Sequence, residues 1–397
     1  MSSNSIIPMS SPDLTNAECE AVAAVLKTPN LSMGDEILAF ETAMRKYSGA
    51  KHAIGVSSGT AGLHLCVRAA GIGPGDLVIT TPFSFVASTN VLLFENAVPI
   101  FVDVDPVTGN IDPEMVKQAA TDLTGNGDTL ERWMPRKGAD EVNPLKAILP
   151  VDVFGQPAAM EVINVTAQRY GLKVIEDSCE ALGARYKGQP AGTLGDYGVY
   201  AFYPNKQITT GEGAMIVTND DKAESIMRAL RNQGRSPGDT WLQHTHLGYN
   251  YRLDEMSAAL GRVQMERLDI LLDKRAQVAD WYNNRINKIP GVKPLEIVQT
   301  TTRMSWFVYV IRMDAEINRD DVAKSLKSQG IPARPYFVPI HLQPYMVERF
   351  GFREGDYPIT ESLGKCSLAL PFSGVMSEEQ VSRVCAGLEV SINDSQK

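Results

Sequence analysis

Short runs of branched and aromatic apolar residues alternate along the chain with segments in which apolar residues recur every three or four positions. Such runs predict buried strands, and such spacing predicts amphipathic helices. The strands are expected at 53–56, 77–80, 99–104, 146–151, 172–175, 197–203 and 214–217, and the helices between them at 60–70, 85–94, 115–123 and 158–170. This alternation predicts an α/β fold with a mainly parallel sheet covered by helices on both faces.

The pattern changes at both ends and once in the middle. Residues 1–15 are expected to form an N-terminal arm, followed by helices at 16–26 and 40–47. The polar segment 125–143 interrupts the alternation and predicts a surface loop. A plain solvated insertion is the simpler interpretation, and a loop that covers a substrate is the alternative.

Beyond residue 217 the pattern predicts a second, smaller body. A helix at 222–231 is followed by a long helical pattern at 254–288, which Pro290 and Gly291 end. A strand at 306–311 and helices at 319–329 and 378–391 follow. We therefore expect an arm (1–15), a large domain (16–253), a long bridging helix (254–288) and a small C-terminal α+β domain (289–397).

Composition excludes several classes of protein. The net charge of −9 over 397 residues argues against a general nucleic-acid binder, which needs a basic face. The five cysteines form no CxxC pair, so no metal site or disulfide framework is expected, and reduced thiols suit a cytoplasmic protein. The sequence shows neither a signal peptide nor an apolar stretch long enough to span a bilayer.

Lys206 is the residue around which the candidate chemistry is arranged. It follows the aromatic run 197–203 and precedes a Thr/Gly turn, so it lies at a strand end. A lysine is usually a solvated surface charge. A lysine held at the mouth of a sheet can instead lose its hydration and form a Schiff base with a carbonyl compound.

Three further strand ends carry residues that could share a site with this lysine. Gly59 and Thr60 open a helix, whose free N–H groups favour a phosphate, although simple capping is the alternative. Phe83 or Phe85 could present an aromatic face to a planar ring, or pack in the core. Asp177 ends a strand, where it could hold a proton on a ring nitrogen or cap the next helix.

Together these residues are the parts that pyridoxal phosphate needs. A phosphate cup, an aromatic face, a carboxylate and an amine each lie at a strand end of one sheet. The carboxylate would keep the pyridine nitrogen protonated, and the amine would bind the cofactor and move protons.

The chain resembles the DegT/DnrJ/EryC1/StrS family of aminotransferases, which depend on pyridoxal phosphate and have the aspartate aminotransferase fold. The resemblance runs from about residue 31 to about residue 345. It is carried by the segments AKHA (50–53), VSSGTA (56–61), GPGD (73–76), FVDVD (101–105), FGQP (154–157), IED (175–177), TLGD (193–196), FYPNK (202–206), TTGEG (209–213), GYNYR (248–252) and HLQP (341–344).

The resemblance implies a role for each candidate. Lys206 matches the Schiff-base lysine and Asp177 the partner of the pyridine nitrogen, and Phe85, rather than Phe83, matches the stacking aromatic. Gly59 and Thr60 match the phosphate cup.

Three more positions take their roles from the family. Asn250 matches an asparagine that reaches the phosphate from the neighbouring subunit, which implies a homodimer with shared sites. Tyr336 and His341 fall near positions that line the sugar-nucleotide cleft, although a surface or core role is an equal alternative for each.

Two residues depart from the family pattern. Ala201 stands where the family commonly has a phosphate-binding serine, so one hydrogen bond to the phosphate is missing or is supplied otherwise, for example by water. Glu180 stands where His or Gln often lies near the ring hydroxyl. A carboxylate there would repel the phenolate unless it is protonated or turned toward a cation.

The resemblance implies transamination of a nucleotide-linked keto-sugar, with glutamate as the expected donor, for amino-sugar biosynthesis in polysaccharides, glycoconjugates or secondary metabolites. Lys206 favours transamination because family members that act as dehydratases lack this lysine. Two alternatives stay open: an aminotransferase of a carbocyclic ketone, and a regulatory member without catalysis.

Overall fold

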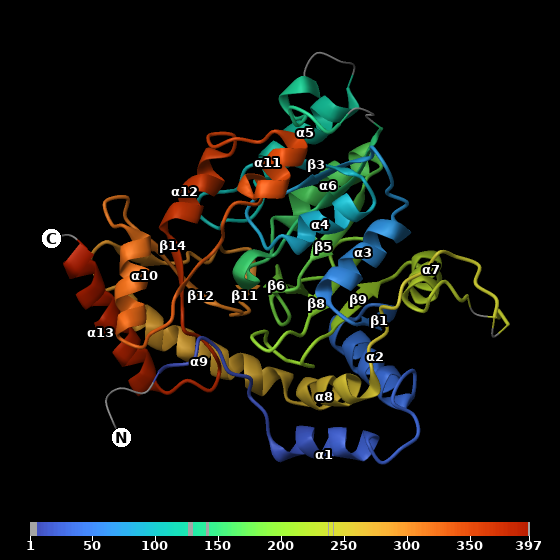
Figure 1. The fold of residues 1–397 in the computed structure, drawn as a ribbon, viewed down its shortest axis with the longest axis horizontal. Coiled ribbons are helices and arrows are strands. Elements are labelled where there is room, and N and C mark those ends of the chain that lie inside the picture. The colour runs from blue at the N-terminus through green and yellow to red at the C-terminus, as the bar shows by residue number, and fades with distance from the viewer. Residues whose placement is uncertain (1–5, 126–129, 140–142, 237, 241, 396–397) are drawn as a thin grey trace.

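A seven-stranded sheet forms the centre of the molecule in the computed structural model, which describes residues 6–125, 130–139, 143–236, 238–240 and 242–395 (Figure 1). The strand order is β1-β9-β8-β5-β4-β2-β3. Only β9 runs antiparallel to its neighbours, and the other pairs in this sheet are parallel. The strands are β1 (His52–Val56), β2 (Leu77–Thr80), β3 (Val98–Phe101), β4 (Leu145–Leu149), β5 (Lys173–Asp177), β8 (Tyr197–Ala201) and β9 (Ala214–Thr218). The predicted fold class is confirmed.

Helices cover both faces of this sheet because its strands are apolar on both sides. In β9, Ala214 and Ile216 join one core cluster, whereas Met215 and Val217 join another. The first cluster packs under α3 (Gly59–Ala69), α4 (Ala87–Phe94) and α7 (Asp221–Arg231). The opposite face packs against α2 (Asp35–Ser48), α5 (Pro113–Thr124), α6 (Met160–Tyr170) and α8 (Glu255–Glu266).

The long helix expected at 254–288 is in fact two helices. α8 ends at Glu266 and α9 (Leu268–Ile286) begins two residues later, with Arg267 at φ −107° and ψ 7° between them. The sequence offers no Pro or Gly at this point. The break lies where the Arg267 side chain binds Asp13 and Glu18 from the N-terminal part of the chain. A long-range contact therefore accompanies the break that local sequence did not predict.

A separate antiparallel sheet lies at the other end of α9. Its strands are β10 (Val292–Pro294), β12 (Tyr309–Met313), β14 (Ser367–Leu370) and β13 (Arg334–Pro335), in that order, with α10 (Arg319–Ser328) and α13 (Glu378–Ser395) beside them (Figure 1). The predicted strand at 306–311 begins three residues later than expected, at Tyr309.

Several short elements were not expected from the sequence, and those of only two or three residues carry no periodic signal. They are the three-stranded sheet of β11 (Thr301–Arg303), β6 (Arg185–Tyr186) and β7 (Gln189–Pro190), the helices α11 (Pro344–Phe350) and α12 (Pro358–Cys366), and the 3-10 turns η1 (Leu130–Arg132), η2 (Val153–Gly155) and η3 (Ile340–Leu342).

The described part of the arm, residues 6–15, packs onto the small sheet and α9. Ile7 is buried in the core of that sheet, and its N–H donates to the Gly330 carbonyl at 3.1 Å. Asp13 accepts from Lys274 and Arg267. Thr15 then caps α1 (Asn16–Val25), the helix expected at this place, through a reciprocal capping box with Glu18.

The described part of the polar excursion is packed rather than simply solvated, while residues 126–129 and 140–142 lie outside the described residues. Trp133 is buried, and its Nε1 donates to Asp122 at 2.8 Å. Arg136 forms two hydrogen bonds with Asp356. Residues 130–139 therefore combine a solvated surface with a packed Trp133, and the simpler interpretation describes only part of them. Over the described ranges, no helix combines the length and apolarity needed to cross a membrane.

Candidate active site

Lys206 lies in a tight loop between β8 and β9 and is not a solvated surface lysine. Two backbone hydrogen bonds close the loop. The Lys206 N–H donates to the Tyr203 carbonyl at 2.9 Å, and the Thr210 N–H donates to the Phe202 carbonyl. The lysine side chain is only 13% exposed. Its Nζ lies 3.7 Å from Glu180 Oε1 and 3.8 Å from the centre of the Phe307 ring. The amine therefore faces a carboxylate and an aromatic face instead of bulk water.

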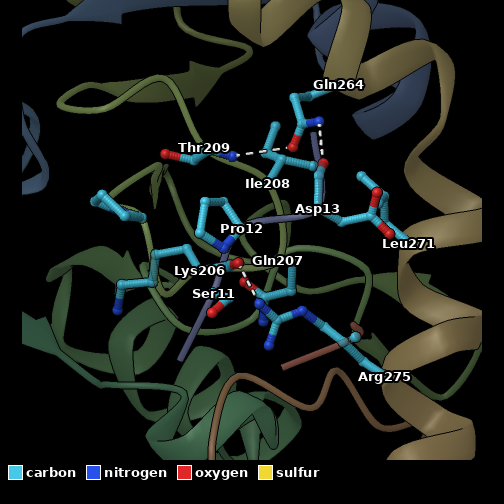
Figure 2. Close-up of a pocket in the computed structure, with 12 residues that line it drawn as sticks. Ser11, Pro12, Asp13, Lys206, Gln207, Ile208, Thr209, Gln264, Leu271 and Arg275 are labelled. Carbon is cyan, nitrogen blue, oxygen red and sulfur yellow. Dashed lines mark hydrogen bonds between the residues drawn. The ribbon is translucent and has the colours of Figure 1, made fainter. Parts of the chain in front are cut away.

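A buried arginine fixes the backbone of this loop. Arg275 reaches from α9 to the loop, with the Lys206 carbonyl 2.5 Å from its Nη2 (Figure 2). Its other donors meet the carbonyls of Asn205, Trp306 and Phe307, each at 3.2 Å. Burial lowers the pKa of Arg275 to about 10, which still leaves the guanidinium charged at neutral pH. One cation thus joins the lysine loop to the segment that carries Phe307.

Asp177 ends β5 and is held in place from two sides. Its Oδ2 accepts from Ser88 Oγ at 2.8 Å, and its Oδ1 accepts from the Cys179 N–H at 3.1 Å. Ser88 lies in the first turn of α4, and its N–H meets the Phe85 carbonyl at 3.4 Å. A carboxylate oxygen accepts more than one hydrogen bond, so Asp177 keeps capacity for a ring N–H.

Phe85 and Phe83 have opposite environments. The Phe85 ring is 64% exposed, whereas Phe83 is fully buried and packs edge-on against Phe154 and Phe337. An exposed ring at the carboxyl end of β2 is available to cover a planar ligand, and a core ring is not. The structure therefore favours Phe85 over Phe83 on exposure.

The start of α3 provides the anion-binding geometry. Ser58 caps the helix by accepting from the Ala61 N–H at 3.1 Å, and Gly59 and Thr60 follow as its first two residues. N–H groups at such positions have no acceptor within the helix. A Cβ on Gly59 would lie 3.1 Å from Ala201 Cβ, so glycine allows the helix to approach the end of β8 closely.

Glu180 is turned toward the lysine. Its Oε2 accepts from the Phe154 N–H at 2.9 Å, while Oε1 faces Lys206 Nζ. Burial raises the pKa of Glu180, and the ammonium of Lys206 opposes that shift. Of the two arrangements expected to avoid repulsion, the structure shows the carboxylate turned toward a cation.

The remaining three candidates have different positions. Tyr336 packs near Phe307, and burial together with Glu180 raises the pKa of its phenol to about 12, so it lies beside the site. Asn250 is exposed on the surface segment after α7. His341 is fully buried and its Nε2 lies 3.0 Å from Glu361 Oε1.

His341 thus lies in the core, which was the alternative to a place lining the sugar-nucleotide cleft. The buried Glu361 carboxylate needs a partner in the core, and His341 provides it while packing against Tyr357.

These residues fit pyridoxal phosphate. A helix starts at a glycine that no side chain could replace without crowding Ala201, a carboxylate retains acceptor capacity, and an amine is held at low exposure. The sequence model of the DegT/DnrJ/EryC1/StrS aminotransferase family matches residues 12–389. The chain belongs to this family. Its expected enzyme class and cofactor are thereby confirmed: it is an aminotransferase that depends on pyridoxal phosphate.

Relatives of this family member agree over nearly their whole length. GDP-perosamine synthase of Caulobacter vibrioides is 36% identical over 386 residues, which is 96% of this chain and 97% of that protein. The pleiotropic regulatory protein of Geobacillus stearothermophilus is 38% identical over 359 residues, 90% and 89% of the two chains. The crystal structure of S. venezuelae DesV in complex with a ketimine intermediate gives a TM-score of 0.85 at 30% identity, covering 97% of this chain and 98% of that one.

Three residues of this aminotransferase's site had not been identified from the sequence: Ser88, Arg275 and Phe307. Ser88 follows Phe85 by three positions, so a helix starting near 85 would have placed both on one face. No local signal points to Arg275 or Phe307, which reach the lysine loop through tertiary contacts.

Proposed function

We propose that this protein transfers an amino group to a nucleotide-linked keto-sugar, with glutamate as the amino donor, in the biosynthesis of amino sugars for a polysaccharide or other glycoconjugate. The observation that carries the proposal is that Lys206, Asp177 and the start of α3 all lie around Cys179, at the carboxyl ends of β8, β5 and β1. The sugar substrate is supported by the name of the Caulobacter vibrioides relative.

Each candidate residue receives a role toward the cofactor. Pyridoxal phosphate, when bound, acts as an electron sink that stabilises negative charge on the substrate carbon. Gly59 and Thr60 would hold its phosphate through backbone N–H groups and a hydroxyl, and Phe85 would cover its ring. Asp177 would accept from the ring N–H, and Ser88 already fixes the orientation of this carboxylate.

Lys206 has two roles in the proposed reaction. Its amine would hold the cofactor covalently and, when free, would move a proton at the substrate carbon. Phe307 and Glu180 confine Nζ to one side of the loop, so the amine stays within reach of the reacting carbon. Tyr336 lines the substrate side.

The protein is proposed to act as a homodimer in the cytoplasm. Asn250 of one subunit would reach the phosphate in the site of the other, which agrees with its exposure on the surface. The cysteines in the described residues are all free thiols, which suits a reducing compartment. The division into arm 1–15, large domain 16–253, bridging segment 254–288 and small domain 289–397 remains a proposal, with the bridging segment now formed by α8 and α9.

The role of Lys206 is tested by replacement. Lys206→Ala should abolish turnover and leave no cofactor attached to protein after borohydride reduction and mass spectrometry. Lys222→Ala, an exposed lysine of α7, should keep both properties. Turnover by Lys206→Ala at the wild-type rate would rule the proposal out.

The substrate is tested with a panel of nucleotide keto-sugars and carbocyclic ketones, each supplied with glutamate, and amino products are detected by mass spectrometry. Amination of a keto-sugar is the expected result, whereas amination of a carbocyclic ketone alone would support the first alternative. Salt-dependent DNA binding without any amination would support a regulatory protein.

A further inference from the structure

Asn250 lies in an extended segment, and the side chains of the residues before and after it point to the opposite side. Backbone hydrogen bonds pair residues 249–251 with the end of α7: the N–H groups of Tyr249 and Tyr251 donate to Leu230 and Arg231 at 2.7 and 3.0 Å. Successive side chains of an extended chain point to opposite sides. The rings of Tyr249 and Tyr251 accordingly stack with their centres 4.9 Å apart, while Asn250 between them is exposed.

The two tyrosines are attached to a buried polar cluster between α3 and α4. Tyr249 Oη donates to Glu95 Oε1 at 3.2 Å, and Tyr251 Oη lies 3.1 Å from His64 Nδ1. His64 Nε2 lies 2.8 Å from the same Glu95 oxygen, and Arg68 Nη1 donates to the other at 2.9 Å. Both tyrosine hydroxyls are therefore held by one His–Glu pair.

The charges of the cluster agree with this hydrogen-bond pattern. Burial lowers the pKa of His64, which keeps the imidazole neutral at physiological pH. A neutral ring donates from Nε2 to the Glu95 carboxylate and accepts at Nδ1 from the Tyr251 hydroxyl. The salt bridge to Arg68 compensates the charge of Glu95. Every hydrogen-bonding group of the imidazole thus has a partner.

We propose that His64 and Glu95 are positioning residues, which hold Tyr249 and Tyr251 so that Asn250 is presented to the phosphate in the partner subunit's site. This inference rests on the proposed function and its shared sites. His64 and Arg68 lie on α3, the same helix whose first residues form the phosphate cup of their own subunit. One helix thus serves the phosphate site of its own subunit at its start and that of the partner farther along.

Hybrid dimers with two affinity tags test the direction of this effect. A dimer of one Lys206→Ala chain and one Asn250→Ala chain contains one intact site, made of Lys206 from the second chain and Asn250 from the first. Glu95→Gln is then placed on either chain. The readouts are the dissociation constant of pyridoxal phosphate at the intact site and the turnover of the hybrid.

The proposal predicts a directional result. Glu95→Gln on the chain that donates Asn250 should weaken binding of pyridoxal phosphate at the intact site about tenfold, whereas on the chain that donates Lys206 it should leave binding unchanged. Equal loss in both placements would show a merely structural role and overturn the proposal, as would no loss in either. A hybrid no better than its parents would also overturn it, and would show that the shared site itself is the part that fails.

Isosteric variants guard against a folding defect. Tyr249→Phe and Tyr251→Phe remove only the hydroxyl groups, and their double variant should reproduce the directional loss. Tyr170→Phe is the matched control, because it removes from α6 an exposed hydroxyl that is hydrogen-bonded to Thr121. This variant should bind pyridoxal phosphate as tightly as the wild type. Wild-type affinity in the double variant would contradict the proposal.

Discussion

The chemistry of single residues at this site depends on what surrounds them. Lys206 is one of many lysines, but its loop, Glu180 and the Phe307 ring remove most of its contact with water. Asp177 is oriented by Ser88 rather than left free at the strand end. Ala201, beside Gly59, leaves the proposed phosphate cup without the hydroxyl that the family commonly has there.

Restoring that hydroxyl should tighten cofactor binding. Ala201→Ser would add a donor next to Gly59, and a hydrogen bond to a charged group contributes about 1.5 kcal/mol, or about tenfold in affinity. The dissociation constant of pyridoxal phosphate, measured by equilibrium dialysis, should fall by about that factor. Ala70→Ser, at the far end of α3, should leave it unchanged. An unchanged constant in Ala201→Ser would mean that another donor already fills this place.

Glu180 should make the free energy of unfolding depend on pH. Burial raises the pKa of Glu180 above the ordinary 4.5. At a pH between the ordinary and the raised pKa, the folded state holds a proton that the unfolded state has released. The contribution of Glu180 to the free energy of unfolding is therefore fully present below pH 4.5. It is lost as the pH rises through the raised pKa, with a slope of up to about 1.4 kcal/mol per pH unit.

Urea unfolding of the apoenzyme between pH 4.5 and 7 checks this dependence. The stability of Glu180→Gln relative to the wild type should increase with pH over this range. Glu212→Gln, an exposed residue of the same lysine loop, should show no such trend. A pH-independent difference for Glu180→Gln would contradict the assignment of a raised pKa.

At the scale of elements, α8 and α9 support the lysine loop. The two helices run along one side of the large sheet to the small one, and α9 supplies Arg275 to the lysine loop (Figures 1 and 2). Gln207, next to the lysine, donates to Ser305 Oγ at 2.7 Å and to the Glu180 carbonyl at 2.5 Å. The lysine loop is thus joined both to α9 and to the segment leading into β12.

Removing the Arg275 guanidinium should loosen this connection. Arg275→Met would leave the carbonyls of the lysine loop without their donor in a buried place, with an expected loss of about 3 kcal/mol in the free energy of unfolding. Arg285→Met, on the same helix but paired with Glu378 at the surface, should cost less than about 1 kcal/mol. Denaturant unfolding of both variants measures the difference, and equal losses would contradict an anchoring role for Arg275.

For the whole molecule, the proposed sharing of sites places a subunit interface near Asn250. Leu247 lies on the segment that leads to Asn250 and is 83% exposed. Single exposed apolar residues are common on protein surfaces, so Leu247 is chosen for its place beside Asn250 and not for its exposure alone. The position of Leu247 close to Asn250 in the sequence agrees with the proposed sharing of sites.

Sedimentation equilibrium should therefore give about twice the 43.4 kDa of one chain. Leu247→Asp should shift the equilibrium toward monomer and lower the affinity for pyridoxal phosphate, because the partner's asparagine is lost with the partner. Val390→Asp, on α13 at the opposite end of the molecule, should remain dimeric (Figure 1). A wild type that sediments as a single chain would refute the shared site.

The sequence by itself determined the large sheet and the order of the candidate chemistry. Strands such as β2 were placed at 77–80 without error, because a strand buried on both faces is a nearly continuous apolar run. Lys206, Asp177 and Gly59 could be located because parallel strands bring their carboxyl ends to one edge. The position of each strand end in the sequence was therefore enough to gather them.

Only the tertiary structure decided how these residues are held. The break at Arg267, the burial of His341 with Glu361, the orientation of Glu180 and the anchoring by Arg275 all depend on contacts between residues far apart in the chain. Local periodicity records which face of an element is buried, but not which charged group meets it there. For that physical reason the sequence located the amine, whereas the fold set its surroundings.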